Sequence, residues 1–540
     1  MNVTKLFSVI IISFLLVHAA GCTDILDTHP EDEISSENFW QSEKDARSAV
    51  SAIYNTLPNI GSEIMLDNLS DIAHTTIPYD FRQTIEKGEH DNTLDYFQNL
   101  WDSHYESIRR ANYFLENVDR IRENDPNVSS ELVSRLEAQV RTIRAMQYMR
   151  LSFFFGDVPL VTSPLSTEEG TEVEETPREA IVDFIKEELM QAAGNLPLEY
   201  SSDNIGRITK GAALSLKARA MLYNNRWQEA ADAAQAVMDL GTYRLYDSFE
   251  NLFNYDAQNN DEVILDRQYS QDVAKHNFFA AFAPHGMNGG AQISPTRTLV
   301  EAFETENGLP IEEDPQHDKR DPYSNRDPRL DYTLFLPAFS DEVPGEMMDN
   351  DVEYDPRPGS GTADEMEKDL ERTKTGFNIQ KYVNPEDIDD RGNNGTNFIL
   401  IRYADVLLMY AEAKIELNEI DNSVYKAINK VRQRPDVDMP PISSGKSQDE
   451  MRAIVRHERM VELALEGRRF WDIRRWKTAE DLMQGNIPGI RYVEVGGNGS
   501  IQTYTFGGTT RSFDPERDYL FPIPDQEMKL NDNLTQNPGY

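Results

Sequence analysis

Residues 454–476 constrain the fold more than any other stretch of this chain. Taken as one helix, the segment has apolar residues at i, i+3, i+4 and i+7 spacing, so they share one face. Ser447 and Glu450, just ahead of it, form the Ser-x-x-Glu pattern of a capping box, which starts a helix. Because the segment contains no nucleophile with its base, we expect a buried amphipathic helix laced with ion pairs. Its apolar face is Met460, Leu463, Ala464, Gly467, Phe470 and Trp471, and its charged flank is Glu458, Arg459, Glu462, Glu466, Arg468 and Arg469.

Helical periodicity continues along most of the chain. Residues 176–179, Thr-Pro-Arg-Glu, form a strong helix start: a cap, a proline at the first helical position and a glutamate that closes the box. Segments 209–223 and 227–241 carry alanines on their facing sides, which lets two antiparallel helices pack closely, as in tetratricopeptide units. The sequence therefore predicts a mostly α-helical fold with such pairs. The predicted helices are residues 42–57, 94–122, 130–155, 177–195, 209–223, 227–241, 398–418 and 422–431.

Four irregular stretches lie between these helices and are rich in Gly, Pro, Asn and Asp: residues 60–93, 254–294, 307–376 and 487–513. In residues 492–506, apolar and polar side chains alternate on both sides of a glycine-rich turn, which predicts a β-hairpin. Long loops on a rigid helical scaffold are where ligand contacts usually lie. We expect the binding residues to lie in these loops and the helix pairs to form the scaffold behind them.

The first 22 residues have the layout of an export signal. Lys5 gives a positive start, residues 6–17 are apolar but too short to span a bilayer, and Ala-Ala-Gly precedes Cys22. This ending resembles a bacterial lipobox, although Ala19 stands where a leucine is usual. Lipidation would use the thiol of Cys22, the one cysteine of the chain. The alternative is an ordinary cleavage site that leaves a free cysteine. We expect a signal peptide at residues 1–21 and a lipid anchor on Cys22.

The charge of the chain excludes some partners. Its 53 basic and 94 acidic residues give a formal net charge of −41. That charge argues against nucleic acid as a partner, and against a polyanionic glycan unless a local basic patch exists. No Pro/Gly/Ser-rich linker divides the chain, so residues 22–540 are expected to form one large domain.

The sequence carries none of the common catalytic motifs. It has no His-Glu-x-x-His zinc motif, no Gly-x-Ser-x-Gly elbow, no Walker loop and no dinucleotide fingerprint. Neighbouring carboxylates are no sign of glycosidase chemistry in so acidic a chain. The acidic stretch 307–330 lacks the EF-hand pattern, so a solvated loop is favoured over a calcium site. We expect no catalysis, no metal and no cofactor.

Several short blocks resemble the SusD/RagB family and follow one another in the family's order. The members of that family are cell-surface lipoproteins that bind nutrients outside the outer membrane of glycan-degrading bacteria. The segment 454–476 resembles the family's signature. The other blocks are residues 26–30, 38–40, 101–115, 138–161, 326–330, 402–414 and 519–540. The resemblance therefore covers the chain nearly end to end.

The resemblance implies a tetratricopeptide-containing helical domain with long loops and short β-hairpins. It implies an N-terminal part of about residues 22–200 and a C-terminal part of about 201–540, in one compact unit. It also implies capture of an oligosaccharide at the outer face of the outer membrane and transfer to a SusC-like TonB-dependent transporter. Peptide capture is the alternative within the family. A surface glycoside hydrolase and a repeat-protein scaffold are the alternatives outside it.

A sugar binder needs flat apolar surface, which tryptophan supplies best. All five tryptophans, however, lie inside predicted helices or family blocks, where packing is their expected role. Stacking is then left to Tyr, Phe or His in the loops. For each loop aromatic the alternative is packing within the loop, and residues 278–282 alternatively form a short buried helix. The candidate ligand contacts are Asp71, Tyr79, Phe81 and Arg82 in the first loop and Tyr269, Phe278, Phe279, His285 and Asn288 in the second.

Overall fold

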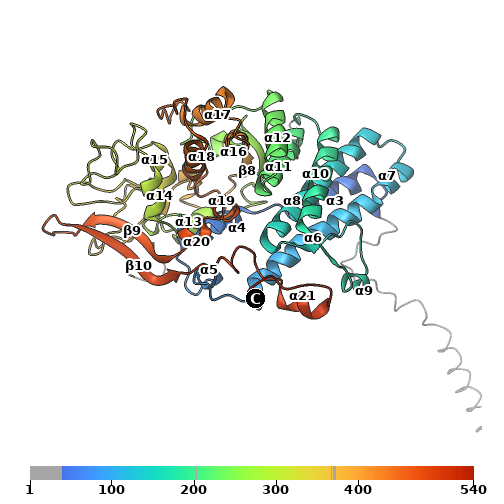
Figure 1. Ribbon diagram of the computed structural model, residues 1–540, viewed down its shortest axis with the longest axis horizontal. Coiled ribbons are helices and arrows are strands. Elements are labelled where there is room, and N and C mark those ends of the chain that lie inside the picture. The colour runs from blue at the N-terminus through green and yellow to red at the C-terminus, as the bar shows by residue number, and fades with distance from the viewer. Residues whose placement is uncertain (1–38, 202–203, 367, 369–371) are drawn as a thin grey trace, which may run out of the picture.

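The computed structural model of the protein describes residues 39–201, 204–366, 368 and 372–540. Its N-terminal half consists largely of α3 (Glu43–Tyr54), α6 (Asp95–Asn117), α7 (Asp119–Asn124), α8 (Ser130–Phe155) and α10 (Arg178–Asn195). α3 and α6 pack against one another and against α8, which also packs on α10. These helices form one end of the molecule, at the right of Figure 1. The signal peptide of residues 1–21, Cys22 and the block 26–30 lie outside the described residues.

The row of helices continues through α11 (Lys210–Tyr223), α12 (Trp227–Asp239), α16 (Tyr403–Glu416), α17 (Asn422–Arg432) and α18 (Gln448–Glu462). Each packs on the next: α10 on α11, α11 on α12, α12 on α16, and α16 on both α17 and α18. Ala212, Ala213, Ala230 and Ala234 are fully buried in the α11–α12 pair. Small side chains let these two helices approach closely, as expected. The mostly α-helical fold with tetratricopeptide-like pairs is confirmed.

The strands in the described residues form five two-stranded antiparallel sheets. The longest is the hairpin predicted near residues 492–506, which projects at the end of the molecule opposite the N-terminal helices (Figure 1). The pairs are β1 (Ala73–Thr75) with β5 (Ile293–Pro295), β2 (Val158–Pro159) with β3 (Glu175–Thr176), β4 (Val263–Arg267) with β8 (Phe398–Arg402), β6 (Leu334–Phe335) with β7 (Asn378–Ile379), and β9 (Gly485–Val493) with β10 (Ile501–Arg511).

Short helices fill the long connections. None of the helices in the described part of the chain is long and apolar enough to cross a bilayer. The short helices are α4 (Ile60–Ile64), η1 (Met65–Leu69), α5 (Phe81–Glu86), α9 (Thr167–Gly170), η3 (Tyr255–Ala257), α13 (Phe278–Phe282), η4 (His285–Met287), α14 (Arg297–Ala302), α15 (Arg329–Thr333), η5 (Pro385–Asp387), α19 (Arg469–Arg475), α20 (Ala479–Leu482) and α21 (Asp525–Leu530).

The predicted helix 398–418 is wrong in its first five residues. Phe398-Ile-Leu-Ile-Arg402 is β8, fully buried and paired with β4, and α16 begins only at Tyr403. A short run of bulky and β-branched side chains suits a buried strand as well as a helix. Partner β4 lies some 130 residues away in sequence, so local pattern alone could not choose between them.

The expected single helix over residues 454–476 is also wrong. α18 begins with the predicted Ser447–Glu450 capping box but ends at Glu462, and α19 starts at Arg469. Between them Leu465 and Gly467 have φ of +58° and +72°, in the left-handed region that ends helices. A Cβ on Gly467 would also meet the backbone carbonyl of Glu63. The apolar residues of the segment are buried, but on two short helices instead of one.

All five tryptophans are buried or half-buried, as their sequence context predicts. Trp40, Trp101 and Trp471 are buried, and Trp471 lies 4.6 Å and 4.8 Å, ring centre to ring centre, from Phe153 and Phe154 of α8. One hydrophobic cluster contains Trp40 and Trp471 and so includes side chains from both ends of the chain. Trp227 and Trp476 are half-buried.

Candidate functional site

The centre of the C-terminal half is a buried network of arginines and glutamates. Arg329 of α15, Arg402 of β8 and Arg434 after α17 all reach Glu462 at the end of α18, at 2.8, 2.7 and 2.9 Å. Arg402 and Arg434 share Glu262 as well. All of these side chains are 0–1% exposed. The network joins the sequence blocks 326–330, 402–414 and 454–476.

The electrostatics of this network indicate a structural role. Burial alone raises the pKa of Glu462, but Arg402, Arg434 and Arg329 hold that pKa well below its usual range. Each charge in the network has a hydrogen-bonded partner of opposite sign, which is what makes burial of ions tolerable. Nε of Arg434 makes no hydrogen bond, but its other two guanidinium nitrogens reach Glu262 and Glu462.

The turn between α18 and α19 ties this network to the N-terminal half. Asp67 of η1 accepts hydrogen bonds from the backbone N–H of Gly467 (2.9 Å) and of Arg469 (3.2 Å). Arg469 in turn donates to both carboxylate oxygens of Asp71 at 2.8 Å. Asp71, a candidate ligand contact from the sequence, is therefore engaged by an arginine and only 3% exposed. Its position favours a structural role.

In the first loop, Phe81 and Arg82 pack against their neighbours. The Phe81 ring stacks on Tyr96 of α6 at 4.2 Å with an interplanar angle of 19°. The Arg82 guanidinium lies 4.3 Å from the centre of the Phe81 ring and donates to both oxygens of Asp80. Both side chains are half-buried, so each keeps only part of its surface for a ligand.

Tyr79 is the exception in that loop. Its side chain is 97% exposed and its φ is +59°, an uncommon conformation for a bulky residue. The loop is held against the second candidate loop, because Thr76 donates its hydroxyl to the carbonyl of Ala291 at 2.9 Å and β1 pairs with β5. The structure thus brings the two predicted loops together at the β1–β5 sheet.

The second loop places its aromatics mostly inward. Phe278 and Phe279 are 1% and 0% exposed in the short helix α13. Neither ring offers a face to solvent, so of the two readings of residues 278–282 the buried helix is correct, and an accessible stacking platform there is wrong. Tyr269 is half-buried; its hydroxyl accepts a long hydrogen bond from the N–H of Ile60 (3.3 Å), and its ring lies edge-on to His276.

His285 and Asn288 lie at the edge of the same loop. His285 is half-buried at the start of η4, and Asn288, directly after it, is exposed with φ of +60°. The Asn288 carbonyl accepts a hydrogen bond from Arg391 at 2.5 Å. Tyr79 and Asn288 are thus the exposed members of the predicted set, whereas His285, like Phe81, Arg82 and Tyr269, is half-buried. A ligand contact at any of them stays a prediction.

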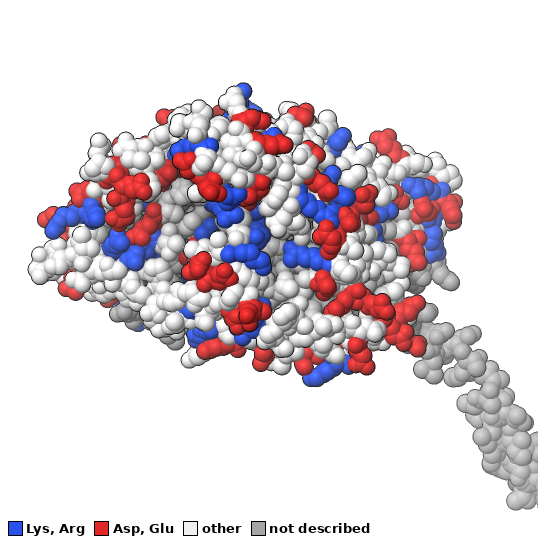
Figure 2. Space-filling view, viewed as in Figure 1, with Lys and Arg blue, Asp and Glu red and all other residues white. Residues whose placement is uncertain are grey.

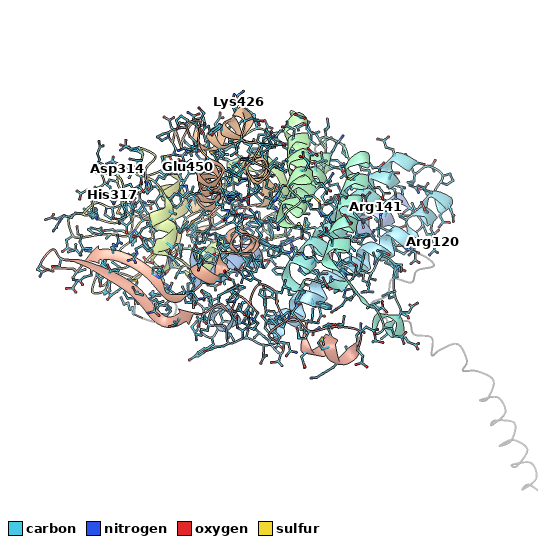
Figure 3. All side chains as sticks on the ribbon, in the orientation of Figure 1. Arg120, Arg141, Asp314, His317, Lys426 and Glu450 are labelled. Carbon is cyan, nitrogen blue, oxygen red and sulfur yellow. The ribbon has the colours of Figure 1, made fainter. Side chains whose placement is uncertain are left out.

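Sequence reasoning missed a cleft of about 290 Å³ between the loop 307–326 and the β9–β10 hairpin. Figure 3 labels His317, one of its lining residues, in that loop above the hairpin. We call this feature the hairpin cleft. It is lined by Arg297, Val300, Glu301, Ile311, Glu312, His317, Lys319, Pro322, Tyr323, Arg326, Phe339, Phe377, Arg491, Ile501 and Thr503. Arg297 and Arg491 lie almost 200 residues apart, so no local pattern points to their meeting.

The acidic loop beside this cleft satisfies its own carboxylates in part. Asp314, also labelled in Figure 3, accepts hydrogen bonds from the hydroxyl of Thr305 (2.6 Å), the amide of Asn307 (2.9 Å) and the N–H of Gln316 (2.8 Å). These bonds hold the pKa of Asp314 below its usual value. Across the described part of the chain, no group of three or more His, Cys, Asp or Glu side chains is arranged to hold a metal ion.

Comparisons with known proteins agree with this architecture. A model described as SusD family matches residues 250–540, and one described as starch-binding associating with outer membrane matches residues 24–222. SusD-like protein P25 of Formosa agariphila is 25% identical over 576 aligned residues, which cover 99% of this chain and 100% of that protein.

Solved structures give the same result. A SusD-like carbohydrate binding protein from Bacteroides fragilis superposes with a TM-score of 0.83 at 30% identity, over 92% of this chain and all of that one. A second SusD-like protein from Bacteroides fragilis gives a TM-score of 0.80 at 26% identity, over 95% of this chain and all of that one. The match of more than half of the sequence to the family, in a fold shared over nearly the whole length, shows that this chain belongs to the SusD family.

Proposed function

We propose that this protein is a cell-surface lipoprotein that binds an oligosaccharide and passes it to a SusC-like TonB-dependent transporter in the outer membrane, without catalysing a reaction. Family membership supports this proposal, as does the similarity at 30% identity to a structure described as carbohydrate binding. The description of the family that matches residues 24–222, starch-binding associating with outer membrane, supports the location. Lipidation of Cys22 is the proposed means of attachment.

One observation carries the ligand side of the proposal: Tyr79 is almost wholly exposed and held in the left-handed backbone region. That conformation costs a residue with a Cβ about 1–2 kcal/mol. A strained, solvent-exposed aromatic ring stabilises nothing in the fold, and such outliers gather where a ligand is held. A tyrosine ring presents a flat apolar face and a hydroxyl, which suit the face and edge of a sugar ring. His285 and Asn288 are the proposed polar contacts on the neighbouring loop.

The test is calorimetric titration of the purified protein with oligosaccharides of increasing length. Affinity should rise with length, because separate contacts on one chain add. Tyr79→Gly should weaken binding by about 1–3 kcal/mol, by analogy with aromatic stacking under nucleic-acid bases. Its unfolding free energy should change by less than about 1 kcal/mol, since relief of backbone strain and the added entropy of the unfolded chain offset each other.

Other outcomes of that titration would contradict the sugar proposal. If peptides bind and no saccharide does, the protein captures peptides. If the saccharide is cleaved during the titration, the protein is a hydrolase. If neither class binds, a scaffold role replaces capture. If saccharides bind equally well to the wild type and to Tyr79→Gly, the contact lies elsewhere on the protein.

Attachment to the membrane has its own test. Cys22→Ala removes the one thiol in the chain, so no acyl chain can be attached there. Cells that express this variant should show no fatty-acid label on the protein and should lose it from the outer-membrane fraction. A variant that keeps both the label and the membrane location would overturn the anchor.

A further inference from the structure

The hairpin cleft has a basic surplus in a strongly acidic protein. Its lining contains four basic side chains, Arg297, Lys319, Arg326 and Arg491, and two carboxylates, Glu301 and Glu312. The whole chain carries a formal net charge of −41, and Figure 2 shows acidic side chains spread over the face that it displays. A cleft of opposite sign in such a surface concentrates field lines and attracts anions.

The pairing of these charges is incomplete. Glu301 is shared by two guanidinium groups: its Oε1 lies 3.1 Å from Nη2 of Arg491 and 3.4 Å from Nε of Arg297. Nε and Nη1 of Arg297 are buried and make no hydrogen bond. Burial lowers the pKa of Arg297, Glu301 raises it, and Arg491 lowers it again, so the two arginines repel one another across Glu301. The second carboxylate, Glu312, is likewise shared, at 3.9 Å from Nη1 of Arg491 and 3.4 Å from Nζ of Lys319. A buried donor left without a partner is costly, and an anionic oxygen would satisfy it.

Arg326 adds a positive charge that no carboxylate of the described residues contacts directly. Its guanidinium donates to the backbone carbonyls of Pro322, Val300 and Phe303, each at 2.7 Å. Within the described part of the chain, no carboxylate forms an ion pair with it. Burial lowers its pKa to about 10, so it remains charged at neutral pH. The carbonyls fix its position but do not cancel its charge.

The remaining wall of the cleft is apolar and aromatic, with Val300, Ile311, Tyr323, Phe339 and Phe377. Its volume of about 290 Å³ is near the lower end of the range for small-molecule sites, roughly 300–1,000 Å³. Apolar walls with a few convergent cations suit a sugar ring that carries one charged group.

We propose that the hairpin cleft binds the anionic group, a carboxylate or a sulfate ester, of the saccharide that this protein captures. The inference rests on the proposed function, and it adds the class of ligand: an acidic saccharide. Arg297 and Arg491 are its proposed anion contacts, and Glu301 limits the affinity by competing for both. Arg297 follows the end of β5 that pairs with the start of β1, whereas Tyr79 follows the opposite end of β1. The cleft and the tyrosine are therefore separable contacts.

The test uses two matched pairs of oligosaccharides and the full-length protein in detergent. The first pair is an oligogalacturonate and its methyl ester, and the second is a sulfated galactan tetrasaccharide and its desulfated form. Calorimetry should show that one acidic form binds at least tenfold more tightly than its neutral counterpart. Which acidic form is preferred identifies the charged group.

Three variants sharpen the result. Arg297→Gln and Arg491→Gln should each weaken binding of the acidic form by roughly ten- to a hundredfold and leave the neutral form unchanged. Glu301→Gln should strengthen binding of the acidic form, a gain that damage to the fold cannot produce. Arg244→Gln is the control, because Arg244 is 72% exposed, pairs with Asp261 and does not line the cleft.

Equal affinity for acidic and neutral forms would overturn the inference, as would full affinity for the acidic form in both arginine variants. If neutral saccharides still bind and Tyr79→Gly weakens them, the proposed function survives that failure. If no saccharide of either kind binds, the proposed function fails together with the cleft.

Discussion

Two arginine-rich regions of this protein use the same chemistry for different ends. Around Glu462, the side chains of Arg329, Arg402 and Arg434 are at most 1% exposed, and each reaches a carboxylate at 2.6–2.7 Å. In the hairpin cleft, Arg491 is 41% exposed and shares Glu301 with Arg297, two of whose nitrogens make no hydrogen bond. Buried arginines that each meet carboxylates directly hold elements together, whereas a partly exposed surplus of one sign is available to a ligand. The pairing of an arginine, more than its presence, indicates its role.

The largest effect is expected from breaking the buried network. Arg402→Met leaves Glu262, Glu462 and Glu466 with less compensation in the interior. Loss of one partner from a buried ion pair costs about 3–5 kcal/mol. Thermal unfolding followed by circular dichroism should show this loss, or no folded protein at all. Arg244→Met is the control and should change stability by less than about 0.5 kcal/mol. An Arg402→Met variant as stable as the control would show that the network does not hold the fold.

The turn that joins the network to the N-terminal half is the next point to break. Gly467→Ala forces a Cβ onto a residue at φ +72° and against the Glu63 carbonyl, so it should cost about 2–4 kcal/mol. Gly485→Ala is a matched control, because Gly485 has φ of +75° but open space around its Cβ position. It should cost only the strain, about 1–2 kcal/mol. Equal melting temperatures for the two variants would refute the close contact at the turn.

Acid should destabilise the buried network, and salt should distinguish it from the cleft. The folded-state pKa of Glu462 lies well below the value of 4.5 that applies to the unfolded chain. Its contribution to stability is therefore present above pH 4.5 and is lost as pH falls below it. The melting temperature should fall when the pH is lowered below about 4.5. At pH 7 it should stay nearly constant in 1 M salt, because salt screens buried pairs weakly. Anion binding in the cleft should weaken in that same salt. A protein destabilised by salt at pH 7 but not by acid would contradict the comparison.

The smallest effect on stability is expected in the cleft. Arg297→Gln removes a guanidinium with a single shared carboxylate, so the unfolding free energy should change by less than about 0.5 kcal/mol. Urea unfolding of this variant beside Arg402→Met gives the sharpest contrast between the two regions. A loss of several kcal/mol in Arg297→Gln would mean that the cleft is part of the architecture.

Much of the helical fold follows from local pattern. α8 begins at Ser130 and ends at Phe155, as its periodicity predicts, and α11, at Lys210–Tyr223, lies within one residue of the predicted segment 209–223. The failures are non-local. β8 is a strand because β4 pairs with it, and the helix 454–476 breaks because Gly467 lies against Glu63. α10 begins at Arg178, whose N–H bonds to Asp157 instead of to the predicted cap Thr176. Each failure depends on a partner distant in sequence.

The binding surface was less predictable for a related reason. Tyr79 and Phe279 are both aromatic residues in polar loops, yet one is 97% exposed and the other fully buried. Sequence pattern gives no direction to a side chain in an irregular segment. The hairpin cleft was missed because its arginines come from α14 and β9, which are far apart in the chain. The charge of the chain makes a local basic patch the condition for binding an acidic glycan, but the sequence does not indicate which residues form that patch.

We propose above all that this protein captures an acidic saccharide without altering it. The most direct measurement is titration of the wild type with an acidic oligosaccharide and its neutral counterpart, followed by mass spectrometry of the recovered ligand. We expect saturable binding, at least tenfold preference for one acidic form, and ligand recovered intact. Cleaved ligand, or the absence of saccharide binding, would contradict it.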